Sequence, residues 1–214
     1  MQADIAVKIC GLSTADDLKV CTTAGADFVG LVFFEKSPRH LSFEAAAALA
    51  DARTEASPQF VALSVDADDG LMADIIASAR PDMLQLHGSE TPEDADALRQ
   101  RYGLPVMKVQ RVSEPGDIAS SLRFTPYVDW LLFDAAAAGP LPGGTGHQFN
   151  WHWLAQFESD LPYMLAGGLD PTNVQDAIRL SGTKAVDVSS GVEKNRGKKD
   201  ATRIQAFVTA AKMR

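Results

Sequence analysis

The sequence predicts an α/β fold: a single (β/α)₈ TIM barrel with a parallel eight-stranded core. The first observation is that short apolar segments of strand length alternate with longer helical segments throughout the 214 residues. The second is the number of strand-like segments, because eight parallel strands close into a filled barrel. An open, doubly wound sheet is the alternative.

The candidate strands are spaced fairly evenly along the chain. They comprise residues 7–11, 28–34, 60–66, 83–88, 106–112, 130–135, 163–168 and 185–191. Helix-start signals lie between them, since Ser13 and Ser42 precede helical segments as expected N-caps. Thr91 and Asp170 each precede a proline, which is favoured at the first helical position.

We expect one catalytic domain over residues 1–214, because no linker or block of like charge divides the chain. Residues 139–146 form the one long segment rich in glycine and proline. This segment lies between the sixth strand and the following helix, and long loops in compact domains are usually functional.

Composition narrows the class of protein. The formal net charge is −8. General binders of nucleic acid or of anionic membranes need a basic surface, so an acidic chain is a poor candidate for either class. The two cysteines, Cys10 and Cys21, form no CxxC pair and no zinc-ligand cluster. We expect no metal, no cofactor, no signal peptide and no membrane span, and therefore a cytoplasmic protein.

Polar residues alternate with apolar ones on six candidate strands, although strands of a parallel barrel are covered on both faces. We expect the polar set to face the barrel axis and to form a ligand-binding mouth at the carboxyl ends. A hydrogen-bonded polar layer in the core is the alternative. The set comprises Lys8, Cys10, Ser64, Asp66, Gln85, His87, Lys108, Gln110, Asp134, Asp187 and Ser189.

Two strand ends carry phosphate-binding signals. Gly167 and Gly168 close the seventh strand, and Ser190 and Gly191 close the eighth. Barrels often bind phosphate with these two loops, where glycine lets backbone N–H groups approach an oxyanion. Two tight turns are the alternative reading. The glycine loop at 143–146 matches no nucleotide-binding pattern.

Four side chains could carry chemistry. Cys10 ends the first strand and Asp134 the sixth, and a thiolate can accept a proton while a carboxylic acid donates one. Their alternatives are a small buried hydrophobe and a helix cap or turn former. Arg39 suits a carboxylate or phosphate, or is a solvated loop charge, and His87 is an inward hydrogen-bonding or catalytic histidine. We expect the nearby ammonium of Lys8 to lower the pKa of the Cys10 thiol.

Seven short segments form an ordered set that covers nearly the whole chain: 8–12, 36–39, 85–88, 133–135, 143–146, 165–169 and 186–193. Each is weak alone, but in this order they resemble the signature blocks of the phosphoribosylanthranilate isomerase family. One departure is Asn150, before Trp151, where the family more often has an aspartate. We assign no catalytic role to that position.

The resemblance implies an enzyme of tryptophan biosynthesis, an aldose–ketose isomerase that performs an Amadori rearrangement. Its substrate would be a phosphosugar that carries an anthranilate group. By resemblance Asp134 is the general acid that opens the sugar ring, and Cys10 is the general base. We expect Asp134 to be needed for that step and not for folding. The expected substrate-binding residues are Arg39, His87, Gly144, Thr145 and Asp187, and the expected phosphate-binding residues are Gly167, Gly168, Ser190 and Gly191.

Two other functions stay open from the sequence. One is another phosphosugar isomerase or epimerase, and the other is a non-catalytic barrel that binds a phosphosugar. The latter would not need both Cys10 and Asp134. We expect a monomer, because no long exposed apolar stripe indicates an interface.

Overall fold

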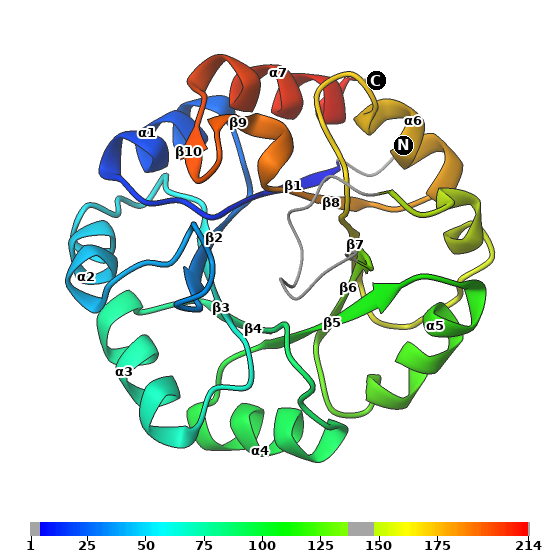
Figure 1. Ribbon diagram of the computed structural model, residues 1–214, viewed down its shortest axis with the longest axis horizontal. Coiled ribbons are helices and arrows are strands. Elements are labelled where there is room, and N and C mark those ends of the chain that lie inside the picture. Colours follow the sequence, from blue (N-terminus) through cyan, green and yellow to red (C-terminus); the bar gives the residue numbers. More distant parts are fainter. Residues whose placement is uncertain (1–4, 137–147, 214) are drawn as a thin grey trace.

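In the computed structural model, which describes residues 5–136 and 148–213, eight parallel strands close into a barrel in chain order (Figure 1). The strands are β1 (Ala6–Cys10), β2 (Phe28–Phe33), β3 (Gln59–Ser64), β4 (Met83–Leu86), β5 (Val106–Val112), β6 (Trp130–Ala135), β7 (Tyr163–Leu165) and β8 (Ala185–Val188). Strand β1 pairs with both β2 and β8. The predicted barrel is therefore confirmed, and the open sheet is excluded.

Helices form an outer ring around the strands (Figure 1). They are α1 (Ala15–Ala24), α2 (Phe43–Asp51), α3 (Asp69–Ala79), α4 (Pro92–Tyr102), α5 (Pro115–Ser120), α6 (Val174–Ser181) and α7 (Ala201–Lys212). Among the described residues, the connection from β6 to β7 contains only a 3₁₀ turn, Trp151–Leu154. No helix in the described part of the chain is long and apolar enough to cross a membrane.

Helix starts follow side-chain capping, with two differences from expectation. Ser42 and Thr91 accept hydrogen bonds from backbone N–H groups in the first turn, as expected. The cap of α1 is Thr14, one residue after the expected Ser13. Asp170 caps no α-helix directly. Its carboxylate accepts hydrogen bonds from Thr172 and Asn173 in a turn that precedes α6.

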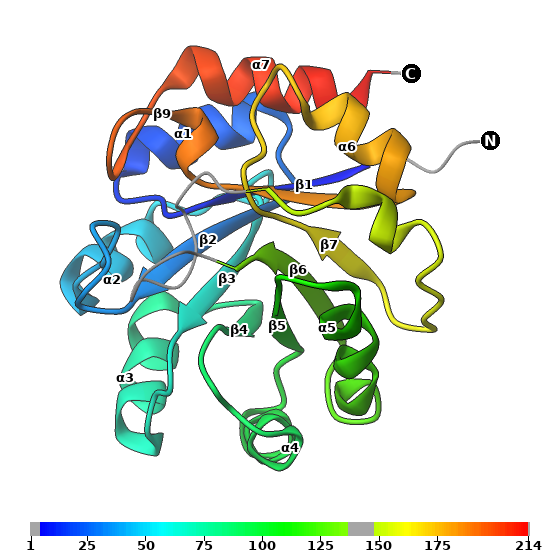
Figure 2. The same cartoon turned by 45° about the vertical axis from the view of Figure 1, so that its right-hand side comes forward.

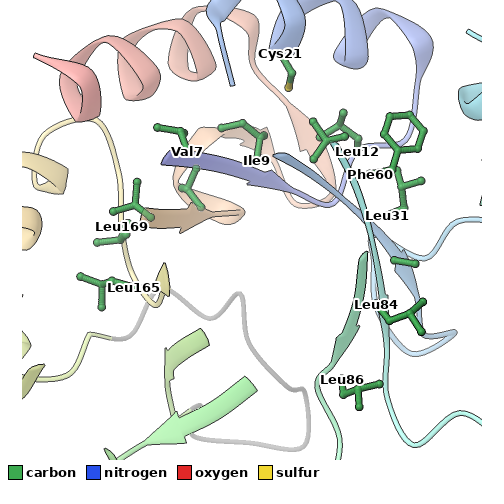
Figure 3. Close-up of a cluster of buried hydrophobic side chains, with 14 of the residues drawn as sticks. Val7, Ile9, Leu12, Cys21, Leu31, Phe60, Leu84, Leu86, Leu165 and Leu169 are labelled. Carbon is green, nitrogen blue, oxygen red and sulfur yellow. The ribbon is translucent and has the colours of Figure 1, made fainter. Parts of the chain in front are cut away.

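Two apolar layers hold the barrel. The larger layer lies between strands and helices and contains Val7, Ile9, Leu31, Leu84, Leu86 and Leu165 (Figure 3). The smaller one gathers side chains from strands all round the barrel, which places it on the axis: Phe28, Val61, Met83, Met107, Leu132 and Met164. The inner layer fills the amino-terminal part of the barrel, so the polar residues nearer the carboxyl ends pack against an apolar layer.

The polar residues that alternate with apolar ones face the barrel axis on four of the six strands, as expected, but not on the other two. On β1, β4, β6 and β8 the apolar partners join the outer layer, as expected. On β5 the inner side chains are Met107 and Val109, so Lys108 points outward, where its ammonium meets the Gly88 carbonyl and the Glu90 carboxylate. On β3 Leu63 faces inward and contacts Cys10, so Ser64 and Asp66 do not face the axis. The polar pattern alone misassigns β5 because a buried lysine can find its partners on the outer side, and it misassigns β3 because Leu63 takes the inner side.

Candidate active site

A pocket opens at the carboxyl ends of the strands and collects most of the predicted site residues. Its polar lining comes from strands β1, β4, β6 and β8 and from the loops after β2, β7 and β8. The residues concerned are Cys10, Ser37, Arg39, Gln85, His87, Asp134, Gly167, Gly168, Asp187, Ser189 and Ser190. This is the rim at which (β/α)₈ enzymes place their active sites. Gly144 and Thr145 lie outside the described residues.

Cys10 ends β1 and is almost fully buried against β2. A Cβ atom at Gly30 would lie 2.7 Å from the Cys10 sulfur, so glycine at that position makes room for the thiol. Burial raises the pKa of Cys10, and the opposing effect of the Lys8 ammonium does not reverse it. Lys8 therefore acts on this pKa in the expected direction, but the loss of hydration outweighs the attraction of one ammonium that is itself paired, so the net shift is upward.

The partner of that ammonium is Asp187. Lys8 Nζ donates a hydrogen bond to Asp187 Oδ1 at 3.0 Å, and both side chains are buried. The two residues are register partners on β1 and β8. Burial alone would lower the pKa of Lys8, but the Asp187 and Cys10 charges outweigh it and raise that pKa. Lys8 therefore stays a cation beneath the pocket.

Asp134 is the penultimate residue of β6, and its carboxyl group lies in the pocket. Burial and the nearby Asp187 carboxylate raise the pKa of Asp134 to about 7. A hydrogen bond from the Ala135 backbone N–H and the charges of Arg111 and Lys8 act in the opposite direction. A carboxyl group with this pKa keeps a proton close to neutral pH and can give it to a substrate.

His87 faces Asp134 across the pocket but forms no ion pair with it. The distance from His87 Nε2 to Asp134 Oδ2 is 3.6 Å, too long for a hydrogen bond. Burial, together with Arg111 and Lys108, lowers the pKa of His87 to about 3, so the ring is neutral. Within the described residues neither ring nitrogen has a hydrogen-bond partner, and the same is true of Gln85 Oε1. These atoms can serve a bound substrate.

Arg39 is buried at the edge of the pocket and is not a solvated charge. Its Nε and Nη2 atoms donate to the two carboxylate oxygens of Glu193 at 2.7 and 3.0 Å. The aliphatic stem of Arg39 lies over Gly11, where an added Cβ would come within 2.6 Å of Arg39 Cδ. A planar guanidinium held in this way presents a fixed edge to a ligand.

The two glycine-rich strand ends differ in how they meet the pocket. Gly167 and Gly168 have φ angles of +87° and +66°, and both line it together with Ser190. A Cβ at Gly167 would lie 2.6 Å from the Ala135 nitrogen, so the chain passes β6 there with no room for a side chain. Gly191 packs against the Leu169 carbonyl instead, beside the pocket and not in its lining.

Sequence reasoning missed three charged residues of this region. Arg111 on β5 donates to the His87 carbonyl at 3.1 Å and acts on the pKa values of His87 and Asp134. Glu193 and Lys199 form a buried ion pair after β8. Side chains alternate along a strand, so Arg111 shares the inward face of β5 with Met107 and Val109. This spacing could have indicated that Arg111 faces the site. Glu193 ends the family-like segment 186–193, but nothing in the local pattern assigns it a role or distinguishes Lys199 from a surface charge.

In the described ranges, no group of three or more histidine, cysteine, aspartate or glutamate side chains is arranged to hold a metal ion. The pocket instead combines a neutral carboxylic acid, a thiol and fixed cations. The closed barrel and this acid–base pocket at its carboxyl rim define the class, a TIM-barrel enzyme.

Comparison with known proteins identifies the family. The model of the N-(5'-phosphoribosyl)anthranilate isomerase family matches residues 7–210. The N-(5'-phosphoribosyl)anthranilate isomerase of Parvibaculum lavamentivorans is 46% identical over 97% of this chain and 98% of its own length. That of Azorhizobium caulinodans is 49% identical over 97% of this chain and 92% of its own. The chain therefore belongs to the N-(5'-phosphoribosyl)anthranilate isomerase family, whose members are aldose–ketose isomerases of tryptophan biosynthesis.

Solved structures agree with this assignment. The crystal structure of phosphoribosyl anthranilate isomerase from Thermotoga maritima superposes with a TM-score of 0.88 at 33% identity, covering 97% of this chain and 98% of that one. A phosphoribosyl anthranilate isomerase in complex with reduced 1-(o-carboxyphenylamino)-1-deoxyribulose 5-phosphate superposes with a TM-score of 0.83 at 31% identity, with the same coverage. The predicted family is confirmed, and the comparisons favour neither alternative function.

Proposed function

We propose that this chain converts N-(5'-phosphoribosyl)anthranilate into 1-(2-carboxyphenylamino)-1-deoxyribulose 5-phosphate, with Asp134 as the general acid and Cys10 as the general base. The observation that carries the proposal is the pairing of two buried groups in one pocket. One is a carboxyl group whose pKa is about 7, and the other is a thiol at the end of β1. An isomerisation that moves protons needs both.

The reaction begins at the sugar ring. Protonated Asp134 gives its proton to the ring oxygen, the bond from C1 to that oxygen breaks, and the nitrogen lone pair forms a Schiff base at C1. The Cys10 thiolate then removes the proton from C2, and the electron pair of that C–H bond forms an enolamine. Transfer of a proton from the C2 hydroxyl to C1 gives the ketone, and the two catalytic groups exchange protons with solvent to reset.

The remaining pocket residues hold the substrate. Arg39 binds the carboxylate of the anthranilate group, and the backbone at Gly167 and Gly168 binds the phosphate together with Ser190 and Gly191. His87 and Asp187 contact the sugar, as do Gly144 and Thr145 of the loop after β6. Remote binding of this kind orients the reacting atoms and lowers the barrier to reaction.

We also propose that the protein acts as a monomer in the cytoplasm, as one catalytic domain over residues 1–214. Two buried free cysteines suit a reducing compartment. Exposed large apolar side chains in the described ranges are few: Phe43, Leu71, Leu122 and Met213. Phe43 and Leu71 line one groove, and two exposed apolar side chains are less than a stable dimer interface needs.

The test is a fluorescence assay. Phosphoribosylanthranilate is generated in place from anthranilate and phosphoribosyl pyrophosphate, and its fluorescence is followed after the protein is added. We expect a decay that requires the protein and that Cys10→Ala and Asp134→Asn each slow by a factor of about 10² or more. Absence of decay with folded protein would contradict the proposed reaction. A decay that both variants retain would contradict the assigned acid and base.

A further inference from the structure

The connection from β8 to α7 folds into a short antiparallel ribbon, β9 (Glu193–Asn195) and β10 (Lys198–Lys199). It lies on the α1 side of the barrel in both views (Figures 1 and 2). Gly197 at its tip packs against the Pro38 carbonyl, so the ribbon touches the loop that carries Arg39. The first residue of β9, Glu193, is buried, although glutamate is among the residues least often found inside proteins.

Glu193 uses its whole hydrogen-bonding capacity inside the protein. Oε1 accepts from Arg39 Nε at 2.7 Å and from Lys199 Nζ at 3.0 Å. Oε2 accepts from Arg39 Nη2 and from the Gly197 backbone N–H, both at 3.0 Å. A carboxylate offers about four acceptor sites, so none is left for a substrate. Glu193 therefore acts on the pocket only through the groups that it holds.

The buried cluster has one positive charge in excess, because Arg39 and Lys199 are cations and Glu193 is the one anion that they share. Lys199 does not line the pocket, and its remaining bonds go to the Ser189 carbonyl and hydroxyl. The excess charge is therefore presented by Arg39, which lines the pocket. Among the described residues, Arg39 Nη1 donates no hydrogen bond to the protein, so this nitrogen can bind an anion.

We propose that Glu193 is a positioning residue that makes the site selective for substrates with a carboxylate on the aromatic ring. It fixes the guanidinium of Arg39 so that the outer edge meets that carboxylate. An arginine without this partner would lose side-chain freedom on binding, and its affinity for the carboxylate would fall. The proposal rests on the proposed function and deepens it by naming what selects the anthranilate group.

The test compares two ligands by calorimetry, so that it does not depend on turnover. One is reduced 1-(o-carboxyphenylamino)-1-deoxyribulose 5-phosphate, and the other is its phenylamino counterpart without the carboxylate. We expect the unchanged protein to bind the first about tenfold or more tightly than the second. Glu193→Gln should reduce this preference to about threefold or less, mainly by weakening the carboxylate ligand.

Glu90→Gln is the matched control, because Glu90 is a partly buried carboxylate that is also paired with a lysine, Lys108, at 2.8 Å, and none of its hydrogen bonds involves Arg39. It should leave the preference unchanged. If Glu193→Gln melts too early for calorimetry, the double variant Glu193→Gln with Lys199→Met removes one anion and one cation, and the same loss of preference is expected. Melting curves accompany every variant.

Two results would overturn the proposal: an unchanged preference in Glu193→Gln, or no preference in the unchanged protein. An unchanged preference with an equal loss of affinity for both ligands would show a structural role or a contact of Arg39 with the phosphate, which both ligands carry. Failure of the proposed function is seen separately, as absence of turnover by a protein that still binds the carboxylate ligand preferentially.

Discussion

Cys10 and Asp134 show how burial decides the protonation states of a site. Burial raises both pKa values, bringing that of Asp134 to about 7 and that of Cys10 above the ordinary value of a thiol. The proposed reaction needs a thiolate and a carboxylic acid at the same time. Because the thiol has the higher pKa of the two, the active form is a minor fraction of the free protein at every pH.

The pH dependence of kcat/KM follows from the raised pKa values of Asp134 and Cys10. Below about pH 7 Asp134 is protonated, and activity should rise as the thiolate fraction grows with pH. Between the two pKa values the gain in thiolate cancels the loss of protonated Asp134, so kcat/KM should stay level. Above the pKa of Cys10 it should fall. Steady-state kinetics from about pH 5 to about pH 10 measures this profile.

Alkylation of Cys10 by iodoacetamide, mapped by mass spectrometry, provides the control for that profile. Its rate should increase with a midpoint above the ordinary pKa of a thiol. A midpoint below this value would contradict the effect of burial on Cys10. An acidic break in kcat/KM near 4 would contradict the raised pKa of Asp134.

Asp134→Asn should be more stable than the unchanged protein at alkaline pH. The folded-state pKa of Asp134 is raised from 3.8 to about 7, so the folded state binds the proton more tightly than the unfolded state. The stability from this group is complete below 3.8 and is lost as pH rises through about 7. The loss corresponds to about 4 kcal/mol as an upper bound.

Thermal melts at several pH values test this expectation. The stability gap between Asp134→Asn and the unchanged protein should be widest near pH 8 and should narrow towards about pH 4. Asp74→Asn, at an exposed position on α3, is the control and should show no such gap. If Asp134→Asn loses its melting transition together with activity, the separation of catalysis from folding is wrong.

At the scale of the element, the backbone just after β7 needs glycine for two reasons, its positive φ angle and the lack of space for a side chain. Gly167 has a φ of +87°, and its Cα faces the Ala135 backbone too closely for any side chain. Gly25, which ends α1, has a similar φ of +81° but nothing within 4 Å of an added Cβ. Gly25 therefore needs glycine only for its backbone conformation, whereas Gly167 needs it for conformation and for space.

Gly25→Ala should lower the free energy of unfolding by about 1 kcal/mol through strain alone. Gly167→Ala should lower it by at least about 1 kcal/mol more, because the added methyl group must displace the end of β6. It should also raise KM, since the loop is proposed to hold the phosphate. Urea unfolding and steady-state kinetics measure both effects. Equal destabilisation by the two substitutions would contradict the close approach.

At the scale of the whole molecule, the Lys8–Asp187 ion pair joins the first strand to the last and so spans the seam where the barrel closes. Lys8→Met should lower the free energy of unfolding by about 3 to 5 kcal/mol, because Asp187 would remain buried without its partner. The double variant with Asp187→Asn should be less destabilised than Lys8→Met. Urea unfolding of the double-mutant cycle gives the coupling energy.

Arg179→Met is the control for this cycle, since Arg179 pairs with Asp176 on the exposed face of α6. Its effect should be less than about 1 kcal/mol. Additive effects of the Lys8 and Asp187 substitutions would show that the pair does not stabilise the closed barrel beyond the separate burial of its members.

Some of this structure follows from the sequence alone. Strand number, strand bounds within a few residues and the caps at Ser42 and Thr91 depend on local pattern, so they were predictable. The positions of Cys10 and Asp134 at strand ends were predictable for the same reason, because parallel strands bring their carboxyl ends to one rim. The ordered motifs identified the family because they constrain the whole length of the chain.

Tertiary structure decided the rest. It turned Lys108 outward to Glu90, made Glu193 the partner of Arg39 across 154 positions of sequence, and raised the pKa of Cys10 despite the neighbouring Lys8. Each of these features depends on burial and on which residues, distant in the sequence, lie close together in the fold. Local sequence pattern determines which elements form and where their ends lie, whereas hydration and charge at the ends of the strands depend on the closed barrel.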